Sequence, residues 1–109
     1  MKIIKVEQFA PRQRTRLIRI TTDTGIEGWA ESTLEGKPHS VPAAIDEFSE
    51  YLISKDPLRI EHHWQQMYRS SFFRGGAHNM SAIAGINAAL WDIAGKHYGV
   101  PSYMLMGGN

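Results

Sequence analysis

Two polar stretches hold the residues whose chemistry could serve a ligand. The first, Thr33 to His39, reads TLEGKPH, and the second, Phe72 to Asn79, reads FFRGGAHN. Arg74 suits a carboxylate group because a guanidinium can donate two parallel hydrogen bonds to it. The two glycines that follow leave the backbone free to approach a ligand. Both stretches also suit a plain role, as a turn between two helices and as a solvated loop.

Other reactive residue types show no catalytic spacing. The histidines are His39, His62, His63, His78 and His97, and none forms an HExxH pair. Structural histidines are therefore favoured over metal ligands. The acids show no metal-loop pattern, and Asp92 is interpreted as a structural residue that caps or pairs with a base. With no cysteine, thiolate metal sites and cysteine nucleophiles are excluded.

Composition predicts a globular protein of one domain, residues 1–109. The net charge is +1, and its signs are mixed along the chain, so neither nucleic acid nor a membrane surface is an expected partner. No apolar run approaches the roughly 20 residues of a membrane span, and the first residues do not form a signal peptide. The absence of cysteine fits the cytoplasm.

The first third of the chain reads as three strands. Apolar and polar residues alternate from Ile4 to about Pro11, from Thr15 to Thr22, and from Ile26 to Ser32. Gly25 can supply the positive φ of a turn, and Gly28 lets another element approach closely. Short connections between successive strands predict an antiparallel meander.

Three helices are predicted after the strands. Ser40 can cap the first, and Asp56-Pro57 is a strong start signal for the second. The third begins near Asn79 or Ser81 and ends at about Tyr98, because glycine and proline follow. The fold class is therefore α+β. The expected core residues are Ile18, Ile20, Trp29 or their neighbours, Phe48, Trp64, Ile86 and Leu90.

The third helix is rich in small residues. Alanines and glycines between 82 and 95 widen its apolar stripe, which indicates a helix covered on more than one side. The chain's own sheet and helices, or a second domain, could cover it.

The whole chain resembles the N-terminal capping domain of the enolase superfamily, in its mandelate racemase-like branch. The stretches that carry the resemblance are ITTDTGIEGWAES, YLISKDPLRIEHHWQQMYR and FFRGGAHNMSAIAGINAALWDIAGKHYGVPSYMLMGG. Within the branch, WAESTLEGKPHSV and YRSSFFRGG look most like galactonate or mannonate dehydratases.

The resemblance implies a larger enzyme with a (β/α)₈ barrel, which would bind Mg²⁺ and carry the acid and base groups. In this family a proton α to a carboxylate is removed, and dehydratases then expel a hydroxyl. This chain would be a fragment, without catalytic or metal-binding residues of its own, inactive alone and prone to form homo-oligomers.

The resemblance also assigns substrate contacts to the two polar stretches. Glu35 and Lys37 would meet the hydroxyls of a sugar acid in the first, and Arg74 and His78 would serve in the second. Alternatives are a racemase or cycloisomerase of the same superfamily, or a stand-alone module that only self-associates.

Overall fold

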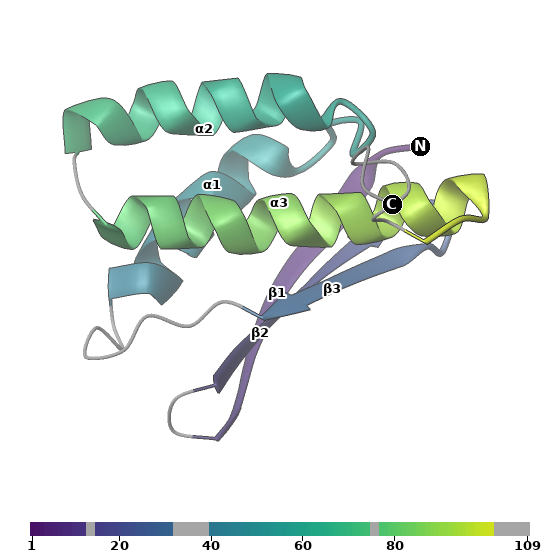
Figure 1. Ribbon diagram of the computed structural model, residues 1–109, viewed down its shortest axis with the longest axis horizontal. Coiled ribbons are helices and arrows are strands. Elements are labelled where there is room, and N and C mark those ends of the chain that lie inside the picture. The colour runs from purple at the N-terminus through teal and green to yellow at the C-terminus, as the bar shows by residue number, and fades with distance from the viewer. Residues whose placement is uncertain (13–14, 32–39, 75–76, 102–109) are drawn as a thin grey trace.

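The computed structural model describes residues 1–12, 15–31, 40–74 and 77–101. The elements are β1 (Ile3–Arg12), β2 (Thr15–Thr22), β3 (Glu27–Glu31), α1 (Ser40–Leu52), α2 (Ile60–Arg74) and α3 (Ala77–Tyr98). Figure 1 shows two layers, with the helices on one face of the sheet. The strands are antiparallel in the order β1-β2-β3. The predicted α+β fold, a meander followed by helices, is confirmed.

The central strand β2 sets the two faces of the sheet. Ile20 lies opposite Val6 on one side and Gly28 on the other. Ile18 and Ile20 are fully buried under the helices, while Arg19 between them points to the outer face. This is the period-2 alternation that the sequence predicts. The turn before β3 contains Gly25, whose φ of 89° confirms the predicted use of positive φ.

Gly28 brings β3 against α3. A Cβ atom at this position would lie 2.2 Å from the carbonyl oxygen of Ala89 and 2.6 Å from Cγ1 of Ile93. Only glycine leaves room for the helix backbone at that distance. The predicted close approach at Gly28 is confirmed, and it explains why this residue, and not Trp29, faces the core.

One cluster of buried side chains joins the sheet to all three helices. Its members are Ile3, Ile18, Ile20, Ala44, Ile45, Phe48, Leu52, Ile60, Met67, Ala82, Ile83, Ile86, Ala89, Leu90, Ile93 and Ala94. Trp29 is 39% exposed, so its expected place in the core is taken by its neighbour Gly28. Trp64, which was also expected in the core, is only partly buried and packs against the outside of this cluster.

The start of α2 differs from the prediction. The backbone amide of Leu58 donates to Oδ1 of Asp56 at 2.9 Å, and the amide of Arg59 donates to the Asp56 carbonyl at 3.4 Å. Asp56 therefore caps a separate turn, and the helix begins at Ile60. The reason is that an aspartate followed by proline suits a tight turn as well as a helix start.

The connection between α2 and α3 is shorter than predicted. Residues 72–74 belong to α2 and residues 77–79 to α3, although the sequence suggests a loop over all of 72–79. The two consecutive glycines are the only residues there with a strong bias against helix, so both helices extend up to them.

The small-residue helix α3 is covered largely by the chain itself. It packs against β2, β3, α1 and α2, and its Ile83, Ile86, Leu90 and Ile93 are fully buried, whereas Tyr98 at its end is exposed. Ala84 and Ala88 are the exposed alanines among its described residues. At its end Gly99 has a φ of 73°, and the amide of Val100 donates to the Gly95 carbonyl at 2.9 Å. This is the predicted glycine end.

Candidate functional site

The predicted ligand residues fall at the borders of the described structure. Glu35 and Lys37 lie outside the described residues. Arg74 is the last residue of α2, and His78 is the second residue of α3, but their side chains also lie outside what is described. Their proposed contacts with a substrate therefore stay predictions.

The described element ends that border the two predicted loops lie toward one side of the molecule. β3 ends at Glu31 and α1 begins at Ser40, on either side of residues 32–39. α2 ends at Arg74 and α3 begins at Ala77, on either side of residues 75–76. These four ends all point toward the left of Figure 1. A ligand held between the two loops would meet the domain there.

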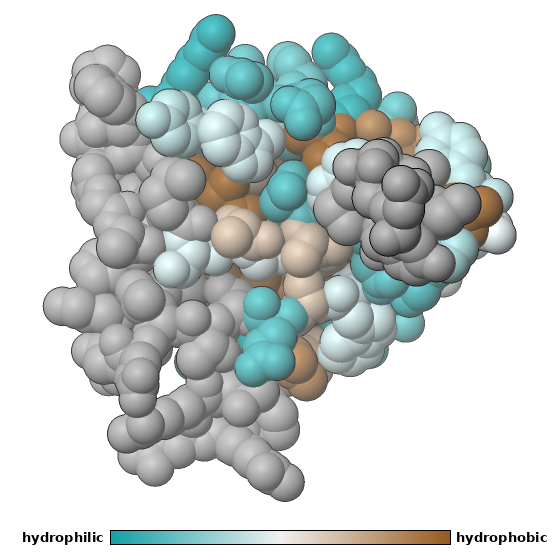
Figure 2. Space-filling model, viewed as in Figure 1, coloured by the Kyte–Doolittle hydropathy of each residue, from teal (hydrophilic) through white to brown (hydrophobic). Residues whose placement is uncertain are grey.

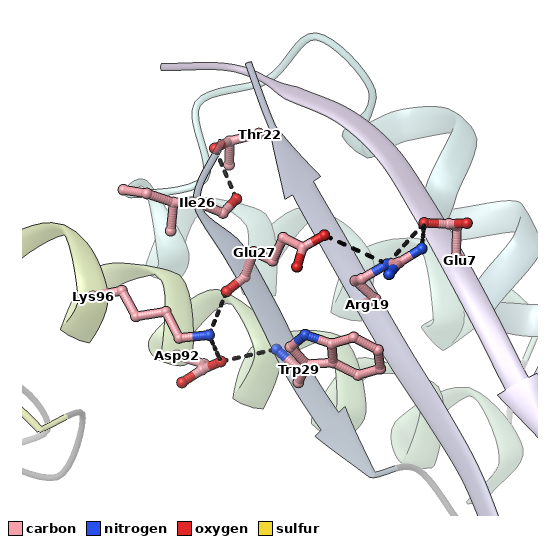
Figure 3. A network of polar contacts seen from close by, with 8 residues as sticks. All are labelled: Glu7, Arg19, Thr22, Ile26, Glu27, Trp29, Asp92 and Lys96. Atoms are coloured by element: carbon pink, nitrogen blue, oxygen red, sulfur yellow. Dashed lines mark hydrogen bonds and ion pairs between the residues drawn. The ribbon is translucent and has the colours of Figure 1, made fainter. Parts of the chain in front are cut away.

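A polar latch joins β3 to α3 (Figure 3). Oδ2 of Asp92 accepts a hydrogen bond from the backbone amide of Trp29 at 2.9 Å. Nζ of Lys96 lies 3.1 Å from the same Oδ2 and donates to the Glu27 carbonyl at 2.6 Å. The helix thus satisfies backbone groups along the free edge of β3, which would otherwise be open to pairing with another strand.

The latch refines the interpretation of Asp92 made from the sequence. Asp92 was predicted to be structural and to pair with a base, and the base is Lys96, one helical turn away. The spacing of four residues is a signal for such a pair. The contact between Asp92 and Trp29 could not be predicted from a local sequence pattern, because the two residues lie 63 positions apart.

The outer face of the sheet carries an arginine beside two stacked aromatic rings, Phe9 and Trp29, whose centres lie 5.7 Å apart. The guanidinium of Arg19 lies 5.0 Å from the ring centre of Phe9 and 5.2 Å from that of Trp29. Its Nη2 and Nε donate to Oε1 of Glu7 at 2.6 and 2.9 Å, and Glu27 is 3.7 Å away. These contacts hold the guanidinium against the sheet. The cluster is therefore a structural clamp across the three strands.

Among the described histidines His63 is the most buried, and both of its ring nitrogens have hydrogen-bond partners. His63 is 1% exposed; its Nδ1 lies 2.9 Å from Oη of Tyr51, and its Nε2 lies 2.7 Å from the Asp56 carbonyl. A carbonyl oxygen only accepts, so Nε2 carries the proton and Nδ1 accepts from the tyrosine hydroxyl. Burial lowers the pKa of His63 and raises the pKa of Tyr51. His63 is a structural residue, as predicted for the histidines.

An open groove lies at the other end of the helices. It has a volume of about 370 Å³ and is lined by Leu58, Arg59, Ile60, Glu61, His62, Trp91, Ala94 and Tyr98. These residues come from the start of α2 and the end of α3, away from the two predicted loops. Its lining is mostly apolar, and neither a hydrogen bond nor an ion pair joins its charged residues, all of them described, into a catalytic set.

The described residues do not supply a metal site. No group of three or more His, Asp or Glu side chains among them is placed to hold an ion. In the same described part, no helix is long and apolar enough to cross a membrane.

An antiparallel three-stranded meander followed by three helices defines the class of the domain as α+β. The chain belongs to the family described as mandelate racemase / muconate lactonizing enzyme, N-terminal domain, which matches residues 7–107. The resemblance that the sequence motifs carry is thereby confirmed.

Named relatives narrow the comparison. A D-galactonate dehydratase from Variovorax paradoxus (strain S110) is 55% identical over 108 residues, which are 99% of this chain and 28% of the relative. A solved enolase-superfamily member from Salmonella Typhimurium is 33% identical, with a TM-score of 0.90 over 98% of this chain and 29% of that one. The chain thus spans less than a third of these proteins, and its described residues contain no (β/α)₈ barrel.

Two further solved structures show the range of the superfamily. The 3,6-anhydro-D-galactonate cycloisomerase from Zobellia galactanivorans is 33% identical, with a TM-score of 0.87 over 99% of this chain and 32% of that one. A Burkholderia xenovorans structure bound to magnesium and fumarate is 27% identical, with a TM-score of 0.88 over 98% of this chain and 27% of that one. Enzymes with different reactions therefore share this N-terminal domain.

Proposed function

We propose that residues 1–109 form the capping, substrate-selecting domain of a Mg²⁺-dependent acid-sugar dehydratase of the galactonate dehydratase type. The observation that carries the proposal is 55% identity over 99% of the chain to a D-galactonate dehydratase. The enzyme would be a cytoplasmic lyase. Its reaction removes the proton α to the carboxylate of a sugar acid, and the hydroxyl on the next carbon leaves with a proton as water.

Metal binding and substrate selection are assigned to different domains of the proposed enzyme. The described residues provide no metal site, so Mg²⁺, three carboxylate ligands and the acid and base groups are assigned to a barrel domain. This chain contributes selectivity through the two predicted stretches, residues 33–39 and 72–79. Glu35 and Lys37 would bind hydroxyls of the sugar acid, and Arg74 and His78 would contact it from the other side.

A chimera tests this role directly. Residues 1–109 would replace the matching segment of the Variovorax paradoxus D-galactonate dehydratase, and product formation would be measured with Mg²⁺ and a panel of hexonates. We expect dehydration by the chimera and none by residues 1–109 alone. A folded chimera that turns over no hexonate, beside an active parent enzyme, would contradict the proposal.

Glu35→Ala in that chimera tests the first loop. Losing one or two hydrogen bonds to substrate hydroxyls is expected to lower kcat/KM roughly tenfold or more. Mg²⁺ affinity should be unchanged, because the metal is assigned to the barrel. Glu47→Ala, an exposed acid of α1, serves as the control and should leave kcat/KM unchanged. An unaltered kcat/KM for every hexonate with Glu35→Ala would show that Glu35 does not read the substrate.

The cycloisomerase remains the second candidate, and one observation favours it: a solved cycloisomerase shares the domain fold at 33% identity. The same chimera distinguishes the two, because a cycloisomerase cap should favour an anhydro-sugar acid over open-chain hexonates. A self-associating module without chemistry would support neither reaction.

A further inference from the structure

We propose that the Asp92–Lys96 pair of α3 positions the first substrate loop, by fixing the strand that leads into residues 32–39. This inference rests on the proposed function, because it gives the pair a part in substrate selectivity. Neither side chain is assigned a contact with substrate. Both act through the backbone of β3, so they are positioning residues.

Three consecutive residues of β3 are held from α3. The Glu27 carbonyl accepts from Nζ of Lys96 at 2.6 Å, and the Trp29 amide donates to Oδ2 of Asp92 at 2.9 Å. Gly28, between them, is packed so closely on α3 that a Cβ would lie 2.2 Å from the carbonyl oxygen of Ala89. Because the contacts are to backbone atoms, they fix the strand itself and not only its side chains (Figure 3).

The held segment adjoins the first predicted loop. β3 is short, Glu27–Glu31, and lies at the edge of the sheet, where β2 pairs with one side of it. Trp29 is two residues from the end of the strand, after which residues 32–39 follow. An edge strand this short has few ladder bonds, so the contacts from α3 supply much of its restraint.

The same helix begins next to the second predicted loop. α3 starts at Ala77, directly after residues 75–76, and α2 ends just before them. α3 therefore carries one border of the second loop and fixes one border of the first. A selectivity site made by two loops needs this relation to be rigid, because a displacement of about 1 Å can cost catalytic efficiency strongly.

Amide hydrogen exchange in residues 1–109 tests the latch without any catalysis. In Asp92→Ala the Trp29 amide loses a charged acceptor, and its exchange should accelerate about tenfold or more beyond any global loss of stability. Asp92→Asn keeps an acceptor oxygen and should restore most of the protection. Asp46→Ala is the matched control: Asp46 accepts from Nε2 of Gln8 at 2.7 Å and so links α1 to β1. Unchanged Trp29 exchange in Asp92→Ala would overturn the inference.

The chimera then tests positioning. Asp92→Ala should raise KM about threefold or more, with a smaller effect on kcat. The differences in kcat/KM between hexonates should become smaller. Asp92→Asn should recover most of the loss, and Asp46→Ala should keep the parent values. Faster Trp29 exchange with unchanged KM and preference would overturn the positioning role and leave the proposed function standing. A chimera inactive on every hexonate would remove the proposed function, and the role in selectivity with it.

Discussion

Gly28 and His63 show how single residues hold this domain together in opposite ways. Gly28 contributes by having no side chain, which lets the carbonyl of Ala89 approach the strand. His63 contributes a ring whose two nitrogens join Tyr51 in α1 to the turn at Asp56. Each position therefore tolerates little change, although neither residue belongs to the predicted ligand site.

Gly28→Ala should destabilise the domain by about 3 kcal/mol, at the upper end of the usual overpacking range. The new methyl group meets a helix carbonyl that cannot rotate away. Gly99→Ala is the control, because its Cβ would meet nothing within 4 Å and only its φ of 73° is strained; about 1 kcal/mol is expected there. Urea unfolding measures both, and a similar loss in the two variants would contradict the close-packing explanation.

His63 should make stability depend on pH. Burial lowers its pKa in the folded state below the ordinary value of 6.5. The unfolded chain then binds more protons just below that pH, so the contribution is complete above about 6.5 and is lost as the pH falls toward the folded pKa. The charged and titratable neighbours are Tyr51, Asp56, Arg59 and His62.

The measurement for His63 is the free energy of unfolding in urea at pH 7.5 and at pH 5.5. The decrease between the two should be smaller in His63→Gln than in the parent chain. His62→Gln, which removes an exposed histidine beside it, should retain the parent's decrease. If the free energy of unfolding decreased equally in the parent and in His63→Gln, the buried ring would be excluded as the source of the pH dependence.

Two sets of contacts hold the sheet, one from α3 on its inner side and one around Arg19 on its outer face. α3 fixes β3 on the inner side and along its edge. On the outer face, Arg19 from β2 reaches Glu7 on β1 and lies near Glu27 on β3, with its guanidinium over the stacked rings of Phe9 and Trp29. The sheet has three strands, so cross-strand contacts of this kind contribute a large share of its stability.

Arg19→Lys should cost about 1 kcal/mol, because lysine keeps the charge but loses the planar fork and the stacking on the rings. The Arg19 and Glu7 side chains are 27% and 29% exposed, so solvent screens their pairing only in part. Arg69→Lys, on the exposed side of α2, should stay within about 0.5 kcal/mol of the parent. Equal effects of the two substitutions in urea unfolding would refute the clamp.

Among the described residues, the domain buries most of the apolar side chains of its last helix. Ile83, Ile86, Leu90 and Ile93 of α3 are covered by the sheet and by the other two helices. The exposed large apolar residues in the described part of the chain are Ile4, Trp29, Ile53, Tyr68, Tyr98 and Val100. Figure 2 shows apolar colour mainly in the middle of one face, beside the segments drawn in grey. Within the described residues, the apolar surface of α3 is thus smaller than the alanine-rich sequence suggests.

We still expect residues 1–109 to form homo-oligomers, now through a reversible contact. Each ~100 Å² of apolar surface buried between copies contributes about 2.5 kcal/mol before the costs of association. Sedimentation equilibrium over a range of micromolar concentrations measures this. A monomer at every concentration, with no binding of a hydrophobic dye, would show that the domain covers its own apolar surface.

The sequence by itself determined the elements and the family. Strand alternation, the glycines at 25 and 99, and the small-residue helix are local signals, because they depend on backbone preference and on spacing within one element. The motif around residues 82–96 sufficed for the resemblance, which the family match confirmed. The start of α2 was less well predicted, because an Asp-Pro pair satisfies a turn and a helix cap equally.

Tertiary structure alone decided which neighbour of each pair faces the core and which distant groups meet. Trp29 is outside because the close approach of α3 leaves room only for Gly28. The bond from Trp29 to Asp92 crosses 63 residues, and the one from Tyr51 to His63 joins two helices. Such contacts depend on how elements pack, and neither hydrophobic period nor capping chemistry encodes that geometry. The sequence could name Asp92 as structural, but only the packed fold shows which strand it holds.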